Sequence, residues 1–160
     1  MGATYFRNFI FGVEDSLVST VGLLSGIAVA GVAVDTIFLT GVVLIFVEAF
    51  SMAAGSFLSE TSAEEYATGK RAVTSRSILS GSVMFASYFF AGFIPLFPYV
   101  IFEGGTALTL SISASVIALF VLGVAGGALS RTSILRSAFR MAVIGGTAIG
   151  IGVAVGSFLG

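Results

Sequence analysis

The chain has 160 residues, of which 57% are hydrophobic and 9% are charged. Soluble domains carry about 25% charged residues, so this composition predicts a membrane protein, with one transmembrane domain over residues 1–160. The sequence contains neither Cys nor His, which excludes disulfides, thiolate metal sites and histidine ligands. Seven basic and eight acidic residues give a net charge of −1, and no basic patch indicates nucleic-acid binding.

Five apolar segments are each long enough to cross a bilayer as a helix, which takes about 20 residues. They are too long, and too uniformly apolar, for the alternating strands of a membrane barrel. The expected fold is therefore an all-α integral membrane bundle of five transmembrane helices. The segments comprise residues 8–31, 36–60, 78–102, 106–129 and 141–160.

The basic residues predict the orientation of the bundle. All of them precede the first segment or lie between segments two and three or around the connection between segments four and five. The opposite side carries only Asp35 and Glu103. The positive-inside rule therefore places the N-terminus in the cytosol and the C-terminus outside. The basic residues are Arg7, Lys70, Arg71, Arg76, Arg131, Arg136 and Arg140.

The first segment contains two adjacent acids, Glu14 and Asp15. An acid inside an apolar helix costs about 2.5 kcal/mol or more, which favours a functional role for Asp15. The alternative for Asp15 is a buried hydrogen bond to a neighbouring helix. Glu14 points about 100° away from Asp15 around the helix. Two interpretations of Glu14 remain open, a residue of a transport path and a residue that faces the cytosolic vestibule.

The second segment contains Glu48, with Met52 one turn later and Ser56 one turn beyond. No basic residue inside any segment pairs with Glu48, so a functional role is favoured for it, whereas Met52 alone would be a packing residue. Carboxylates supply charge and oxygen to a metal ion, and the Met thioether favours transition metals over Ca²⁺ or Mg²⁺. With a rise of 1.5 Å per residue, Asp15 and Met52 are expected at a similar depth, and Glu48 about one turn deeper.

Three further acids, Glu60, Glu64 and Glu65, follow at the cytosolic end of this segment. A role in capturing cations from the cytosol is favoured for Glu60 and Glu64. For Glu65 we favour the alternative, a solvated extension of the helix. Farther along, Pro95 and Pro98 predict a kink or an end in the third segment, because proline cannot continue a helix undisturbed.

Glycines recur at four-residue steps in the first and last segments. Small residues at this spacing let two helices approach closely. The packing is either within one subunit or between two, and both possibilities stay open. The glycines concerned are Gly22, Gly26, Gly146, Gly150, Gly152 and Gly156.

Three stretches resemble the vacuolar iron transporter family. They are GVEDSLVSTVGLLSG, VEAFSMAAGSFLSETSAEEY and GFIPLFPY. The resemblance implies a homodimer of five-span subunits in which the first span of each lines a central path. It also implies export of Fe²⁺, and in some relatives Mn²⁺, from the cytosol in exchange for protons. Asp15, Glu48 and Met52 match the family's acid and its acid–Met pair.

The chain departs from that family pattern in two places. Ser56 stands where the family usually has a Glu. The family often carries a helical, Glu-rich cytosolic domain between spans two and three, and the roughly 17 residues between Glu60 and Ile78 are too few for one. The resemblance is therefore to a short form, in which Glu60, Glu64 and Glu65 are a remnant of that domain.

The sequence predicts a proton-coupled exporter of Fe²⁺ or Mn²⁺ that needs no cofactor besides the transported ion. Two alternatives stay open: a non-transporting membrane partner or metal-sensing subunit, and a proton-coupled exporter of organic cations. An enzyme is not expected, because the chain has no nucleophile elbow and no phosphate loop. The expected location is a prokaryotic cell membrane, or a vacuolar membrane if the source is eukaryotic.

Overall fold

A computed structural model describes residues 2–70, 73–130 and 133–160. Within these residues the chain is helical and contains no strand, and five of its helices are long and apolar enough to cross a membrane. This confirms the predicted all-α membrane bundle. The helices are α1 (Gly2–Val29), α2 (Val34–Thr68), α3 (Ser75–Leu96), α4 (Pro98–Ile101), α5 (Gly104–Leu129) and α6 (Ile134–Leu159).

Most helices extend beyond the apolar segments that predict them, because polar residues continue a helix once it leaves the bilayer. The clearest case is α2, which continues eight residues past Glu60 to Thr68. It ends at Gly69, whose φ of 67° is left-handed and whose N–H donates to the Glu65 carbonyl oxygen. The predicted interruption by proline is confirmed, since α3 ends at Leu96 and Pro98 begins the short α4.

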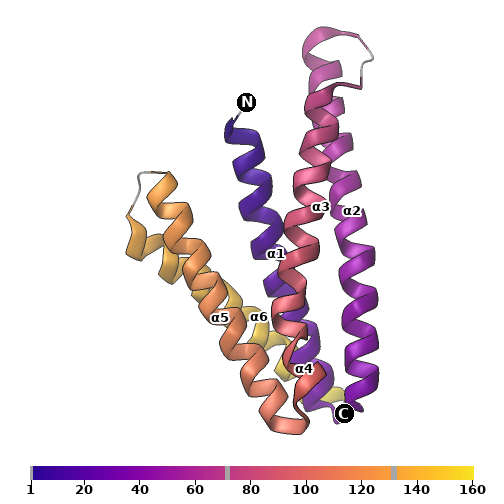
Figure 1. Ribbon diagram of the computed structural model, residues 1–160, viewed down its shortest axis with the longest axis vertical. Coiled ribbons are helices and arrows are strands. Elements are labelled where there is room, and N and C mark those ends of the chain that lie inside the picture. Colours follow the sequence, from indigo (N-terminus) through magenta and orange to yellow (C-terminus); the bar gives the residue numbers. More distant parts are fainter. Residues whose placement is uncertain (1, 71–72, 131–132) are drawn as a thin grey trace.

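Figure 1 shows α1, α2 and α3 side by side, with α5 and α6 as an inclined pair that leans against α1. Helix α1 touches each of the other four long helices. The chain begins at one end of the bundle and finishes at the other, as five crossings require. We call the end where α1 begins, where α2 meets α3 and where α5 meets α6 the basic end.

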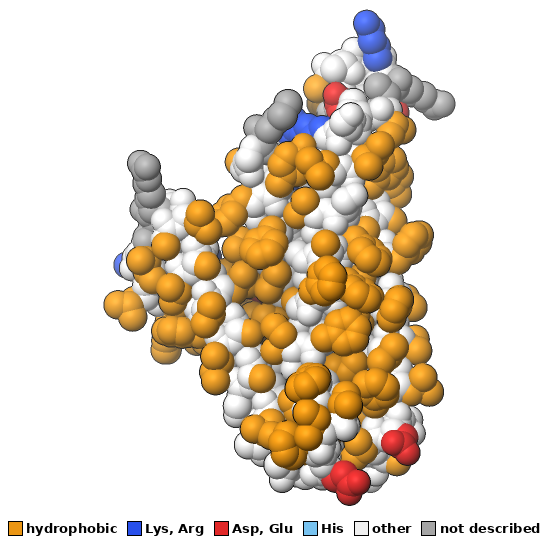
Figure 2. Space-filling view, in the orientation of Figure 1, with side chains coloured by type: hydrophobic (Ala, Val, Ile, Leu, Met, Phe, Trp, Pro, Cys, Tyr) orange, Lys and Arg blue, Asp and Glu red, His pale blue; other side chains and the backbone are white. Residues whose placement is uncertain are grey.

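Charge separates along the bundle as the sequence predicts. Figure 2 shows basic side chains toward the upper end, with some acidic ones among them, and acidic side chains without basic ones at the lower end; hydrophobic side chains cover most of the face between. Such an apolar surface suits contact with lipid, because lipid tails do not penalise exposed hydrophobic side chains. Two of the seven basic residues, Arg71 and Arg131, lie outside the described residues. The cytosolic location of the basic end stays a prediction.

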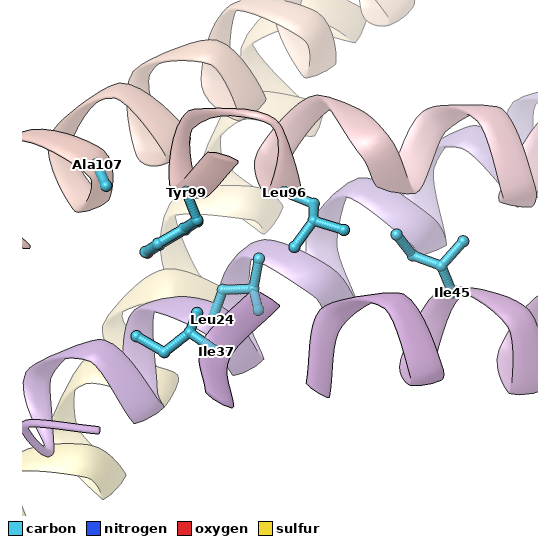
Figure 3. Packing of buried hydrophobic residues seen from close by; sticks show 6 residues of the cluster. All are labelled: Leu24, Ile37, Ile45, Leu96, Tyr99 and Ala107. Atoms are coloured by element: carbon cyan, nitrogen blue, oxygen red, sulfur yellow. The ribbon is translucent and has the colours of Figure 1, made fainter. Parts of the chain in front are cut away.

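A buried apolar cluster closes the bundle at the end opposite the basic end (Figure 3). Here α1 and α2 pack against the region where α3, α4 and α5 follow one another. The proline-interrupted corner thus contributes to the core instead of remaining a surface loop. The cluster consists of Leu24, Ile37, Ile45, Leu96, Tyr99 and Ala107.

Helices α1 and α3 run parallel in a fixed register. The Asn8 amide donates to the Ser80 hydroxyl, and the Ser16 hydroxyl donates to the Tyr88 carbonyl oxygen at 2.7 Å. Both hydrogen bonds join residues 72 positions apart. Because the donors are two helical turns apart, these bonds hold the two helices together over that length.

Four of the six glycines, Gly22, Gly26, Gly152 and Gly156, pack α1 against α6 within one chain, which is one of the two possibilities left by the sequence. A Cβ added at Gly152 would collide with the Gly22 carbonyl oxygen, and one at Gly156 would collide with that of Gly26. The two backbones are therefore in direct contact. Gly146 and Gly150 differ, because a Cβ at either would have nothing within 4 Å in this chain.

This difference predicts opposite effects for two matched substitutions in α6. Gly150→Ala is expected to be neutral or stabilising, because Ala is favoured over Gly in a helix by up to about 1 kcal/mol. Gly152→Ala must push α1 and α6 apart, and overpacking of this kind costs about 1–3 kcal/mol, or roughly 5 °C in Tm. Thermal unfolding of both variants in detergent measures the difference. An equal Tm for the two would contradict the direct contact of the backbones.

Candidate functional site

Asp15 of α1 and Glu48 of α2 come together inside the apolar part of the bundle. Both side chains are half-buried, and the two carboxylates are close enough to act on each other electrostatically. In the described part of the chain, neither carboxylate makes a salt bridge with a Lys or Arg. Two like charges without a basic partner are unfavourable in such surroundings, so this pair is suited to bind a cation or a proton.

Tyr88 of α3 lies beside the two acids, and sequence reasoning missed it. Its side chain is fully buried, and its hydroxyl oxygen is 2.8 Å from the hydroxyl of Ser19. Both Asp15 and Glu48 act electrostatically on this hydroxyl. The sequence feature that could have identified it is a single tyrosine among the phenylalanines of SYFFAGF, in a segment whose other residues suit contact with lipid.

A cavity of about 550 Å³ lies between α1, α2 and α3 on the basic-end side of the acidic pair. We call it the seam cavity. Its wall combines carboxylate, amide, hydroxyl and thioether groups, which are the kinds of donor that replace water around a metal ion, and it also includes the positively charged Arg7. Among the lining residues are Asn8, Phe11, Met52, Ser56, Glu60 and Met84.

Ser56 is held in this wall by Asn8, a second residue that the sequence reasoning did not single out. The buried Asn8 amide donates to the Ser56 hydroxyl at 2.8 Å and also to the Ser80 hydroxyl. The three side chains form an uncharged group that joins α1, α2 and α3. At this depth the cavity therefore offers neutral oxygens, with Met52 one helical turn farther from the basic end.

The register between α1 and α2 differs from the depth estimated from the sequence. That estimate aligned the ends of the apolar segments, which sets Asn8 opposite Glu60. In the structure Asn8 is opposite Ser56, a shift of about one turn, or roughly 6 Å. Asp15 is therefore level with Glu48 instead of Met52. The predicted order of depths is therefore corrected: Met52 lies nearer the basic end than Asp15 and Glu48 do.

The acids at the end of α2 are largely engaged in structural contacts. Glu60 forms a salt bridge with Arg76, and the Glu64 carboxylate accepts a hydrogen bond from the Thr74 hydroxyl at 2.7 Å. Thr74 in turn caps the N-terminus of α3. Over residues 2–70, 73–130 and 133–160, no three acids gather closely enough to hold a metal ion. Of the two acids for which cation capture was favoured, Glu60 and Glu64, only Glu60 lines the seam cavity, and Glu65 does not line it either.

Glu14 faces another part of the bundle. Arg140 of α6 acts electrostatically on its carboxylate, and Glu14 does not line the seam cavity. Glu14 also feels the charge of Asp15, but its basic neighbour is on α6, whereas Asp15 faces Glu48 of α2, as the 100° step between adjacent helical residues leads one to expect. The structure thus brings Asp15 and Glu48 together, about one helical turn from the lining residues Phe11 and Met52 of the seam cavity, and places Glu14 toward α6.

Two stretches that together span most of the chain match one known protein family. The family model described as VIT family matches residues 6–80 and residues 64–157. The chain belongs to the VIT family. This membership indicates transport of a metal or other ion across a membrane by a multi-pass protein, and it fits a protein that is not an enzyme. No curated protein matches the chain at a significant level.

The two stretches matched to the VIT family overlap between residues 64 and 80, where α2 ends and α3 begins. In this VIT protein only residues 69–74 separate the two helices, so no inserted domain lies between them. Ser56 stands at a position where the family resemblance leads one to expect a Glu. Among the described residues that line the seam cavity, Glu60 is the one acid that could supply the missing negative charge. The candidate charged ligands nearest the centre of the bundle are therefore Asp15 and Glu48.

Proposed function

We propose that this protein exports a divalent transition metal, Fe²⁺ or Mn²⁺, from the cytosol in exchange for protons. The observation that carries the proposal is the meeting of Asp15 and Glu48 within an apolar bundle, with the seam cavity about one helical turn nearer the basic end. An intramembrane acid without a basic partner marks an ion pathway, because its cost is otherwise uncompensated. Met52 lies on the same route.

The chemistry of the pair explains how metal and proton movements are coupled. A carboxylate binds a metal ion only when it is deprotonated, so metal binding releases protons and proton binding releases metal. Two adjacent carboxylates match the charge of one divalent ion. The thioether of Met52 favours a transition metal over Ca²⁺ or Mg²⁺ on the way to the pair. The neutral oxygens of Ser56 and Asn8 suit an ion that still carries some of its water.

We further propose that the working unit is a homodimer in the membrane. One chain supplies two clustered carboxylates, and the face of α2 that carries Glu48 and Met52 is only half-buried. A second copy would double the number of ligands and cover part of that face. This part of the proposal rests on the family resemblance, in which the first span of each subunit lines a shared path. The same resemblance supports a prokaryotic cell membrane as the location.

Purified protein in liposomes tests the proposal. Vesicles that contain a pH-sensitive dye are mixed with Fe²⁺ under reducing conditions, Mn²⁺, Ca²⁺ or Mg²⁺ outside. We expect Fe²⁺ or Mn²⁺ to enter while the lumen becomes more alkaline, because an antiporter moves protons outward as metal moves inward. Entry of Ca²⁺ and Mg²⁺ is expected to be much slower.

Other outcomes identify the alternatives. Absence of metal flux from purified protein would contradict the transporter and favour a non-transporting partner or sensor. Metal flux without any change of internal pH would retain the transporter but remove the proton coupling. Flux of a lipophilic organic cation that Fe²⁺ does not inhibit would favour the organic-cation exporter.

A further inference from the structure

A second cavity, of about 360 Å³, lies between α1, α5 and α6 at the basic end. We call it the arginine cavity. Arg136 and Arg140 of α6 line it together with Ser130 and Ser137, and Phe6 and Ile10 of α1 form an apolar wall. Within the described part of the chain, it shares no lining residue with the seam cavity. Its ligand chemistry must therefore be considered separately from metal transport.

The arginine cavity carries uncompensated positive charge. Arg136 and Arg140 are four residues apart, so their side chains leave the same face of α6, where like charges destabilise the helix slightly. Glu14 acts electrostatically on Arg140, which leaves one carboxylate for two guanidinium groups. Among the described residues, neither arginine forms a salt bridge. An anion in the cavity would relieve this imbalance.

The donors of the cavity suit one kind of anion. Guanidinium groups form paired, charge-assisted hydrogen bonds to phosphate oxygens, and serine hydroxyls can donate to the same oxygens. A free anion in water would gain nothing from the Phe6 and Ile10 side chains. A phosphate attached to acyl chains would gain binding energy, because the apolar wall and the exposed Leu135 and Phe139 of α6 offer an apolar surface to those chains.

We propose that the arginine cavity binds the phosphate headgroup of an anionic phospholipid. Basic pockets between transmembrane helices on the cytoplasmic side are known to suit such headgroups. The cavity lies where the α5–α6 pair and the start of α1 diverge in Figure 1. A headgroup bound there joins α1 to α5 and α6 at the end of the bundle where these helices are farthest apart.

Lipid binding by the purified protein tests this proposal. Native mass spectrometry in detergent, with added phosphatidylglycerol or phosphatidylcholine, compares three proteins: the wild type, the double variant R136Q/R140Q and Lys70→Gln. Lys70→Gln removes one exposed basic residue at the same end but outside the cavity. We expect wild type and Lys70→Gln to retain phosphatidylglycerol in preference to phosphatidylcholine. The double variant is expected to lose about thirtyfold in affinity for phosphatidylglycerol, since each arginine near a lipid phosphate contributes about a factor of five.

Several outcomes would overturn the proposal. Equal retention of phosphatidylglycerol by wild type and the double variant would do so, as would equal retention of the two lipids by the wild type. Competition by millimolar inorganic phosphate would show that the cavity takes a free anion and not a lipid. If the double variant does not fold, Arg136→Gln alone gives the test, because it leaves the interaction between Arg140 and Glu14 in place. Undiminished retention by that variant would equally overturn the proposal.

Discussion

Replacing Glu48 by Gln is expected to reduce Fe²⁺ and Mn²⁺ flux in liposomes by about a hundredfold. The substitution keeps the size of the side chain and removes its charge. A carboxylate roughly 4 Å from a unit positive charge contributes about 4 kcal/mol at an effective dielectric constant of 20. Each 1.4 kcal/mol is about a factor of ten, so a hundredfold loss needs about 2.8 kcal/mol, which is still available when water recovers about 1 kcal/mol of the interaction. The measurement is the initial rate of metal uptake.

Glu103→Gln is the matched control for this experiment. It makes the same chemical change at an exposed position just before α5, at the end opposite the basic end, where Glu103 makes no side-chain cap. Its flux is expected to equal that of wild type. If Glu48→Gln transports metal as fast as Glu103→Gln does, with the same dependence on pH, then Glu48 is not a ligand and the acidic pair does not carry transport.

Asp15→Asn is expected to raise the thermal stability of the metal-free protein and at the same time to remove transport. At pH 8 the substitution ends the repulsion between Asp15 and Glu48, for which the described residues supply no basic partner. A gain of about 1 kcal/mol corresponds to roughly 3 °C in Tm for a chain of this size. Residues that serve function commonly lower the stability of the folded protein in this way. An acid with a structural role would show the opposite behaviour, because replacing it would lower Tm.

Metal binding gives a second readout for the same variant. A ligand present at a hundred times its Kd stabilises a protein by about 2.7 kcal/mol, so Fe²⁺ or Mn²⁺ is expected to raise the Tm of the wild type by several degrees. Asp15→Asn should show little or no increase. Asp35→Asn, at an exposed site in the first turn of α2, is the matched control and should respond as the wild type does. A lower Tm for metal-free Asp15→Asn would contradict the proposed role of Asp15.

Much of the fold was accessible from the sequence because the length of an apolar run determines whether it can cross a bilayer. The five helices and the break before Pro98 follow from that constraint and from the missing N–H of proline, although Pro95 itself is accommodated inside α3. The extension of α2 to Thr68 did not follow, because polar residues there leave the bilayer while still favouring a helix. The partner of the α1 glycines also required the structure, since spacing identifies a small face and not its neighbour.

The two acids of the candidate site could be predicted from the sequence, whereas the residues that surround them could not. Asp15 and Glu48 stand out in sequence because acids are costly in lipid, and each can be recognised alone. Tyr88 and Asn8 gain significance only from neighbours on other helices, 69 and 48 residues away. The order of Asp15, Glu48 and Met52 along the bundle likewise depends on the offset between α1 and α2. The lengths of the apolar segments determine that offset only to within about one helical turn.

The fixed register of α1 and α3 limits which parts of the bundle can move during transport. Hydrogen bonds two turns apart tie α1 to α3, and backbone contact at the glycines ties α1 to α6, so these three helices form a single stiff frame. Among the described residues, only the hydrogen bond from Asn8 to Ser56 joins side chains of α1 and α2. Helix α2 is in turn tied to α3, by the hydroxyls of Ser56 and Ser80, by the salt bridge between Glu60 and Arg76 and by packing along its length. The proposed transport therefore requires some of these contacts to break before Glu48 can move away from Asp15.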